Sequence, residues 1–179
     1  MKVTILSYPI NCILNNECVA WISKQIKKKE KSYICVASLH LLTEGLDRND
    51  VKKSIDNAGM VTPDGMSIVW ALRWRGCNHA ERLYGPDLML SICEKAAKSK
   101  WRIGLLGGSQ GQSARLRKTI ENRHSGINIV CVTDTPKRPI EEKENKRVNQ
   151  KINASKPNVL FVGLGCPLQE LWMAENIQK

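Results

Sequence analysis

Residues 102–123, RIGLLGGSQGQSARLRKTIENR, contain the stretch that decides the fold. The apolar run at 102–107 predicts a buried strand, and this strand leads directly into the turn Gly107-Gly108. A basic helix is predicted from 111 to 123. Glycine permits the backbone conformations that a tight strand-to-helix turn requires. A buried strand, a glycine turn and a helix in this order are typical of a parallel sheet covered by helices.

The same alternation of short apolar runs and amphipathic stretches continues on both sides of this segment. Strands are predicted at 3–7, 33–37, 102–107, 127–132 and 158–164, and helices at 16–29, 39–46, 50–58, 66–75, 87–99, 111–123, 140–155 and 168–177. We therefore expect an α/β fold that is Rossmann-like, with a mostly parallel sheet and helices on both faces. Ligands of such sheets bind beyond the carboxyl ends of the strands, so the loops after residues 37, 107, 132 and 164 are expected to form the site.

The length and composition indicate one globular domain over residues 1–179, or at most a domain with an appendage. Of the 179 residues, 42% are hydrophobic and 25% are charged, which is ordinary for a globular protein. No apolar run reaches the roughly 18 residues that a membrane-spanning helix needs, and the N-terminal residues lack the apolar segment of a secretory signal. We therefore expect a cytoplasmic protein.

The chain is strongly basic, with 28 Lys and Arg against 17 Asp and Glu, a net charge of +11. Such a charge favours anionic partners, which include nucleic acids, anionic lipid surfaces and phosphorylated substrates. The densest basic run is KQIKKKEK at 24–31. It predicts either a solvated helix face or an electrostatic contact with anionic lipid.

Seven cysteines stand at 12, 18, 35, 77, 93, 131 and 166, and no two of them form a CxxC pair. We expect buried, reduced thiols, as is usual in a cytoplasmic protein. A zinc site would need clustered Cys and His residues, and the histidines at 40, 79 and 124 are not expected to supply them. The sequence also has no DxD pair of the kind that holds a divalent cation. Neither a metal nor another cofactor is predicted.

Two segments have the residue types that bind phosphate. Gly107, Gly108 and Ser109 precede a predicted helix, whose N-terminal N–H groups attract anions. The turn departs from GxGxxG at Leu106 and has no P-loop lysine, so it is either a diphosphate contact or only a tight turn. Arg82, in AERLYGPDL at 80–88, is either a solvated charge or a bidentate phosphate ligand.

Three other segments have candidate polar groups next to predicted strands or helices. Asp64, in VTPDGMSIVWALRWRG at 61–76, is either a helix cap or a partly desolvated general base. Gln169, in FVGLGCPLQELWM at 161–173, is either an exposed helix residue or an amide that reads a sugar or base. Ser38 and His40 follow the second predicted strand, which makes them candidate pocket residues.

Taken together, these segments resemble a known family. The stretches TPDGMSIVWALRWRG, ERLYGPDLML, GLLGG and VGLGCPLQELWM occur in the order and approximate spacing of the WecG/TagA/CpsF glycosyltransferases. The INASKPNVLFVGLG stretch is also similar to that family's approach to its last motif. The resemblance extends from about Val3 to Met173. Each motif is weak alone, but the ordered set is specific.

The resemblance implies an inverting transfer of an N-acetylmannosamine-type sugar from a UDP donor to a polyprenyl-diphosphate-linked sugar, in the synthesis of bacterial teichoic acid or surface polysaccharide. It places the family's catalytic carboxylate on Asp64 and its arginine on Arg82, and it implies a reaction without metal. The expected substrate-binding residues are Ser38, His40, Thr62, Gly65, Gly107, Gly108, Ser109, Gly163, Gly165, Pro167, Gln169 and Glu170. The inner face of the plasma membrane then becomes the expected place of action.

The chain departs from the family pattern in two places. Where the family usually has asparagine after the second strand, this chain has Ala37-Ser38-Leu39-His40, so Ser38 replaces a pocket amide. The family normally continues beyond the PxQExW helix into an arginine-bearing C-terminal appendage linked to membrane docking. We expect residues 1–179 to be the catalytic core without that appendage. Homo-oligomerisation is left open.

Two alternatives to the glycosyltransferase remain at this stage. An NAD(P)-binding oxidoreductase would use GLLGGSQG, with Asp134 after the next strand as the acid that binds ribose. A basic nucleic-acid-binding module would depend on the net charge, but the sequence has no recognition-helix, RRM or KH signature. Nucleic acid is therefore not an expected partner.

Overall fold

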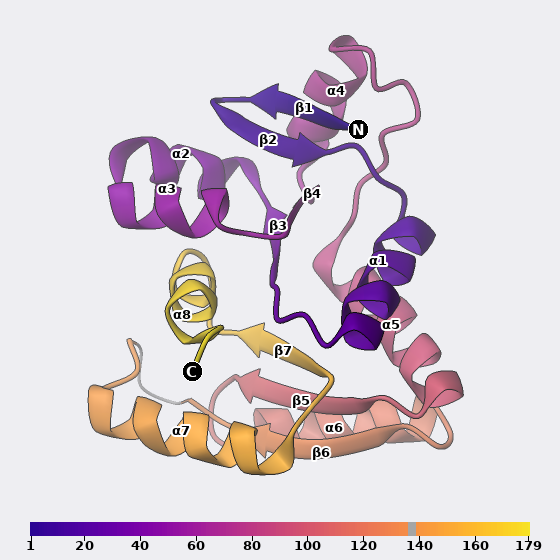
Figure 1. Cartoon of the computed structure of the whole chain (residues 1–179), viewed down its shortest axis with the longest axis vertical. Coiled ribbons are helices and arrows are strands. Elements are labelled where there is room, and N and C mark those ends of the chain that lie inside the picture. Colours follow the sequence, from indigo (N-terminus) through magenta and orange to yellow (C-terminus); the bar gives the residue numbers. More distant parts are fainter. Residues whose placement is uncertain (136–138) are drawn as a thin grey trace. The chain divides into compact units, whose positions relative to one another are not determined.

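The computed structural model describes residues 1–135 and 139–179, and it shows a mixed α/β architecture (Figure 1). The fold class predicted from the sequence is confirmed. The elements run in the order β1 (Lys2–Ile5), β2 (Tyr8–Asn11), α1 (Asn15–Lys28), β3 (Ile34–Ala37), α2 (Leu39–Asp47), α3 (Asn49–Asp56), β4 (Met60–Pro63), α4 (Met66–Trp74), α5 (Gly85–Ser99), β5 (Arg102–Gly107), α6 (Gln112–Arg123), β6 (Asn128–Thr133), α7 (Glu142–Ser155), β7 (Val159–Gly163) and α8 (Leu168–Asn176).

The chain divides into two compact units. Unit 1 consists of Met1–Ser91 and Glu170–Gln178, and unit 2 consists of Ile92–Gln169 and Lys179. That residues 1–179 act as a single catalytic core stays a prediction. Within the described residues, no helix is both long and apolar enough to cross a bilayer.

Unit 1 contains two small sheets. Strands β1 and β2 pair antiparallel, and β3 and β4 pair parallel with Cys35 opposite Val61. The predicted strand 3–7 ends early because Leu6 and Ser7 form the two-residue turn of the β1–β2 hairpin, where both have positive φ. Strands β2 and β4 were not predicted, since each has only four residues and contains a proline.

The core of unit 1 forms between these sheets and the amphipathic helices α2, α3 and α4. One face of helix α4 packs into the core, and its buried residues are Ile68, Val69 and Leu72. The largest fully buried apolar side chains of this unit are Tyr8, Ile10, Leu41, Leu42, Val51, Ile55, Ile68, Val69, Leu72 and Leu83. This apolar packing holds the carboxyl ends of β3 and β4 in fixed positions, because burial of apolar surface is the main favourable contribution to folding.

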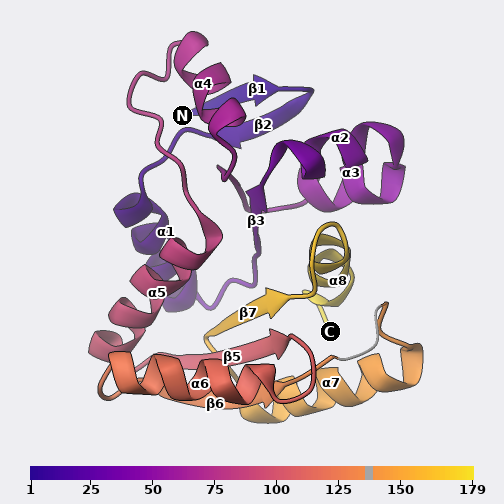
Figure 2. The ribbon, with the colours of Figure 1, turned by 180° about the vertical axis from the view of Figure 1, so that it is seen from behind.

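Unit 2 is built on a parallel sheet with the strand order β6-β5-β7. Strand β5 is central and has the continuous apolar run that such a strand requires; its residues from Ile103 to Gly107 are all buried. Helices α6 and α7 lie on opposite faces of this sheet, as the two opposed views show (Figure 2). The sequence predicted one mostly parallel sheet with helices on both faces. Unit 2 has this arrangement, but the hydrogen bonds of the described strands form three separate sheets instead of one.

The cysteines only partly follow the prediction. Cys18, Cys35, Cys93 and Cys131 are buried thiols in the reduced state, and Cys166 is also reduced. Cys12 and Cys77 instead form a disulfide, with their Cα atoms 6.4 Å apart. The expectation of reduced thiols throughout is therefore wrong for this pair. The reason is tertiary, because the fold brings together the end of β2 and the segment after α4, which are 65 residues apart in the sequence.

Candidate active site

Asp64 lies at the corner where β4 ends and α4 begins. Its backbone N–H donates a hydrogen bond to the carbonyl of Ala37, at 2.9 Å, at the end of the neighbouring strand β3. The carboxyl ends of the two parallel strands therefore meet at this residue. The structure makes Gly65 the N-cap residue of α4, with no side-chain cap. The interpretation of Asp64 as the helix cap is therefore wrong.

Arg82 contacts Asp64 at two points. Its Nε donates to the backbone carbonyl of Asp64 at 2.5 Å, and its Nη2 lies 3.4 Å from Oδ1 of the carboxylate. The next residue, Leu83, donates its N–H to the carbonyl of Pro63 at 2.8 Å. The segment before α5 is thus fixed along the end of β4. Asp64 and Arg82, the two catalytic candidates, are therefore in direct contact although they lie 18 positions apart in the sequence.

The environment of Asp64 makes its carboxylate a stronger base than an ordinary aspartate. Partial burial raises its pKa because the charged form loses hydration, and the nearby Arg82 cation opposes this shift without cancelling it. The Asp64 side chain is 24% exposed, which leaves it open to a ligand. A carboxylate with a raised pKa at a strand end is suited to accept a proton from a substrate hydroxyl.

The other candidates of unit 1 have different environments. Ser38 caps α2, and its hydroxyl oxygen accepts a hydrogen bond from the N–H of Leu41 at 3.3 Å. His40 is exposed on that helix. Thr62 in β4 is fully buried, and its Oγ1 has no hydrogen-bond partner among the residues that the structure describes. Ser38 therefore has a structural role already, whereas Thr62 has an unused polar atom two residues before Asp64.

The glycine turn of unit 2 lies at the end of β5. Gly107 has φ +120 and stands opposite Gly163 at the end of β7. A Cβ atom at Gly107 would collide with the backbone of Gly163. Glycine is thus required here by the close approach of two strand ends, as well as by its φ angle. Gly108, with φ +88, continues the turn.

The N-terminus of α6, where the sequence predicted either a diphosphate contact or a tight turn, is capped by side chains. The Asp134 carboxylate accepts hydrogen bonds from the N–H groups of Gly111 and Ser113, at 2.7 and 3.1 Å, and from the Ser113 hydroxyl. The N–H of Ser109 donates to Oε1 of Gln112 at 2.8 Å. These bonds hold the pKa of Asp134 below its usual range. Asp134 therefore stabilises a helix start, which argues against the NAD(P) alternative that needed it for ribose.

The last predicted motif lies between β7 and α8. The N–H of Gly165 donates to Oε1 of Gln169 at 3.3 Å, and a cis peptide bond joins Cys166 to Pro167. Glu170, in the first turn of α8, is only 1% exposed. The side chain of Gln169 thus folds back on its own turn in this structure.

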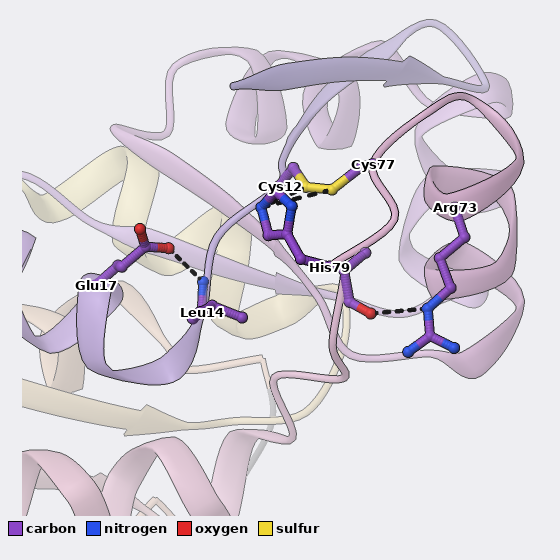
Figure 3. The surroundings of a disulfide bond; sticks show 7 residues. Cys12, Leu14, Glu17, Arg73, Cys77 and His79 are labelled. Atoms are coloured by element: carbon purple, nitrogen blue, oxygen red, sulfur yellow. Dashed lines mark hydrogen bonds between the residues drawn. A yellow bond between two sulfur atoms is a disulfide. The ribbon is translucent and has the colours of Figure 1, made fainter.

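One cluster was missed by the sequence analysis. Cys12, Cys77 and His79 present ligand atoms within 4.8 Å of one another (Figure 3). The expectation that no histidine would lie with the cysteines is wrong for His79. The spacing Cys77-x-His79 was the only local signal, since Cys12 joins the cluster through the fold.

The comparisons with known proteins agree with the motif order. Residues 3–179 match the family described as "Glycosyl transferase WecG/TagA/CpsF family". A curated relative from Bacillus spizizenii (strain ATCC 23059 / NRRL B-14472 / W23), named N-acetylglucosaminyldiphosphoundecaprenol N-acetyl-beta-D-mannosaminyltransferase, is 25% identical over 171 residues. The match covers 92% of this chain and 65% of the relative. The resemblance predicted from the motifs is confirmed, and the chain belongs to the WecG/TagA/CpsF family of glycosyltransferases.

Proposed function

We propose that this chain is the catalytic core of an inverting glycosyltransferase. It would move an N-acetylmannosamine-type sugar from a UDP donor to a polyprenyl-diphosphate-linked sugar in the synthesis of a cell-surface polymer. Family membership supports the reaction class, and the printed name of the relative supports the sugar and the lipid-linked acceptor. The net charge of +11 suits substrates that both contain a diphosphate.

The main structural support for this proposal is the position of Asp64 between the end of β4 and the start of α4. Inversion requires one displacement, in which the acceptor hydroxyl oxygen attacks C1 of the donor sugar and the bond from C1 to the UDP oxygen breaks. The hydroxyl proton must leave as the new bond forms, and Asp64 would accept it. Burial of this carboxylate favours its protonated form, so proton transfer to it is more favourable than to an aspartate in water.

Arg82 would act on the same step in two ways. Its contact with the Asp64 carbonyl fixes the corner that holds the base, and its positive charge keeps part of the Asp64 population ionised at lower pH. A guanidinium at this place would also stabilise the negative charge that develops on the departing UDP. In this proposal Arg82 positions the base and complements the leaving group.

The remaining candidates would bind substrate. In unit 1 these are Ser38, His40, Thr62, Gly65 and Glu170, and in unit 2 they are Gly107, Gly108, Ser109, Gly163, Gly165, Pro167 and Gln169. Thr62 is the strongest of these candidates, because its buried hydroxyl, two residues before the base, has no hydrogen-bond partner in the described part of the chain. Ser109 is the weakest, because its N–H already donates to Gln112.

We also propose that helix α4 binds peripherally to an anionic membrane surface. Three apolar side chains lie on one side of the helix because they are spaced four residues apart: Met66, Trp70 and Trp74. Of these, Trp70 is 63% exposed and Trp74 is 87% exposed. Arg73 and Arg75, also exposed, add positive charge beside them. Tryptophan with arginine is the combination that favours the interface of an anionic bilayer, where a polyprenyl-linked acceptor resides.

A direct assay tests the proposed reaction. The purified protein is incubated with UDP-N-acetylmannosamine and a lipid-linked N-acetylglucosamine acceptor, and the products are identified by mass spectrometry. The expected result is an acceptor heavier by one N-acetylhexosamine residue, together with free UDP. NADH and UDP are titrated in parallel, and binding of NADH without binding of UDP would contradict the proposal.

A further inference from the structure

We propose that Cys12, Cys77 and His79 form a zinc-binding site in the reduced protein. The three residues lie in unit 1 and come from two segments. Cys12 directly follows β2, whereas Cys77 and His79 lie in the segment after α4. The site is separate from the chemistry of sugar transfer, and its occupancy does not depend on the proposed function.

The distances from the His79 nitrogen to the two sulfurs are close to those of a tetrahedral zinc site. Nε2 of His79 lies 3.4 Å from Sγ of Cys12 and 4.0 Å from Sγ of Cys77. With zinc–sulfur and zinc–nitrogen bonds of about 2.3 and 2.05 Å, a tetrahedral zinc places its sulfur and nitrogen ligands about 3.6 Å apart. The two measured distances lie on either side of that value. The same nitrogen faces both sulfurs, so His79 would bind the metal through Nε2.

The chemistry of the ligands favours zinc among the common metals. Two thiolates and one imidazole form a soft ligand set that suits zinc, whereas magnesium and calcium prefer oxygen ligands. A divalent ion would neutralise two thiolates at positions where Cys12 is 5% exposed and Cys77 is fully buried, and where unpaired charges are costly. His79 is exposed. The fourth position of the tetrahedron would therefore be filled by water.

The disulfide and the zinc site are alternative states of the same two sulfurs. Bonded sulfurs are about 2.05 Å apart, whereas two thiolates on one tetrahedral zinc are about 3.8 Å apart. Rotation of the cysteine side chains changes this separation without moving the backbone. Thiols stay reduced in the cytosol, so both sulfurs would be available as metal ligands there.

Zinc at this site would anchor the segment that holds Arg82. His79 is three residues before Arg82, and Ala80 accepts a hydrogen bond from Nε of Arg73 at 3.0 Å (Figure 3). At the other end of the segment, the N–H of Leu83 donates a hydrogen bond to the carbonyl of Pro63. A metal bound to Cys12, Cys77 and His79 would thus tie the start of this segment to the residue after β2, whereas Leu83 ties its end to β4.

The test measures zinc in the protein purified with a phosphine reductant and without chelators. We expect one zinc ion per chain, and we expect Cys12→Ser, Cys77→Ser and His79→Gln to weaken zinc binding by about 100-fold or more in competition with a chromophoric chelator. Cys93→Ala, which removes a buried thiol outside the cluster, serves as the matched control and should keep the metal.

Cobalt(II) substitution of the unaltered protein gives a second readout that does not depend on how the variants fold. We expect thiolate-to-cobalt charge-transfer absorption together with the strong visible bands of a tetrahedral complex. A reduced protein that holds no more zinc than Cys12→Ser, or cobalt spectra without the thiolate band, would overturn the proposal.

Discussion

The guanidinium of Arg82 contacts Asp64 through both the backbone and the side chain of that residue. Nε lies 2.5 Å from the Asp64 carbonyl oxygen, and Nη2 lies 3.4 Å from Oδ1. Burial raises the pKa of the carboxyl, and the cation lowers it by a smaller amount. The corner between β4 and α4 therefore holds a carboxylate whose basicity is set by two opposing and separable effects.

The first prediction concerns the pH dependence of sugar transfer. The base must be ionised to act, so kcat/KM should fall as the pH is lowered through the raised pKa of Asp64. Arg82→Gln removes the cation that lowers this pKa, and the acidic limb of the profile should therefore move to higher pH. Arg82→Lys keeps the charge and should move it less. An acidic limb that stays in place, or moves to lower pH, in Arg82→Gln would contradict the assignment.

The second prediction concerns the cap of α6. Asp134→Ala removes the acceptor of two backbone N–H groups, which should destabilise the start of the helix by about 1 kcal/mol. Hydrogen exchange of the α6 peptides measures this as faster exchange. Glu121→Gln, which breaks the exposed pair with Arg117 in the same helix, is the control and should have a smaller effect.

The Asp134 cap also has a pH signature. Its pKa is lower in the folded state than in the unfolded chain, so its contribution to stability is complete above the ordinary carboxyl pKa. That contribution is lost as the pH falls through the lowered value. The difference in α6 protection between the unaltered protein and Asp134→Ala should therefore shrink in acid. A difference that is constant with pH would show that the carboxylate charge is not involved.

The third prediction separates the two demands on Gly107. Gly126→Ala places a side chain at φ +81 in open space and should cost about 1–2 kcal/mol. Gly107→Ala adds a collision with the backbone of Gly163 and should cost about 2–5 kcal/mol. Hydrogen exchange in β5 and β7 compares the variants within unit 2. Equal costs would mean that the strand ends separate easily.

The fourth prediction tests the proposed membrane contact. Replacement of Trp70 and Trp74 by Ala should reduce co-sedimentation with vesicles that contain anionic lipid, and stability should change little because both side chains are exposed. Replacement of Lys27 and Lys28 by Gln tests the basic run at 24–31 in the same assay. If only the lysine variant loses vesicle binding, the contact belongs to α1 and the proposal for α4 is wrong.

Much of the fold could be predicted because its signals are local. Strand β5 is a continuous apolar run that ends in two glycines, and the predicted strand 102–107 agrees with it at both ends. The predicted helices agree with the observed ones to within two residues at each end. Strands β2 and β4 were missed because four residues with a proline show no period that distinguishes a strand from a loop.

The candidate site could be predicted only where one segment contains the whole signal. Asp64 stands out locally between a proline and a glycine, but its contact with Arg82 is a product of the fold. The cap of α6 by Asp134 joins residues more than 20 positions apart. Cys12, which lies 65 residues before Cys77, could not be assigned to a cluster from spacing alone. Contacts of this kind depend on tertiary packing, which local patterns do not encode.

The measurement that tests the central claim most directly is the transfer rate of Asp64→Asn with UDP-N-acetylmannosamine and a lipid-linked acceptor. The amide keeps the shape of the side chain but cannot accept the proton, so the rate should fall by about 10²–10⁴-fold. Because the folded state disfavours the charged carboxylate, the variant should be at least as stable at neutral pH as the unaltered protein. Asp56→Asn, which removes an exposed carboxylate paired with Lys52, should keep full activity. Undiminished transfer by a folded Asp64→Asn protein would contradict the account.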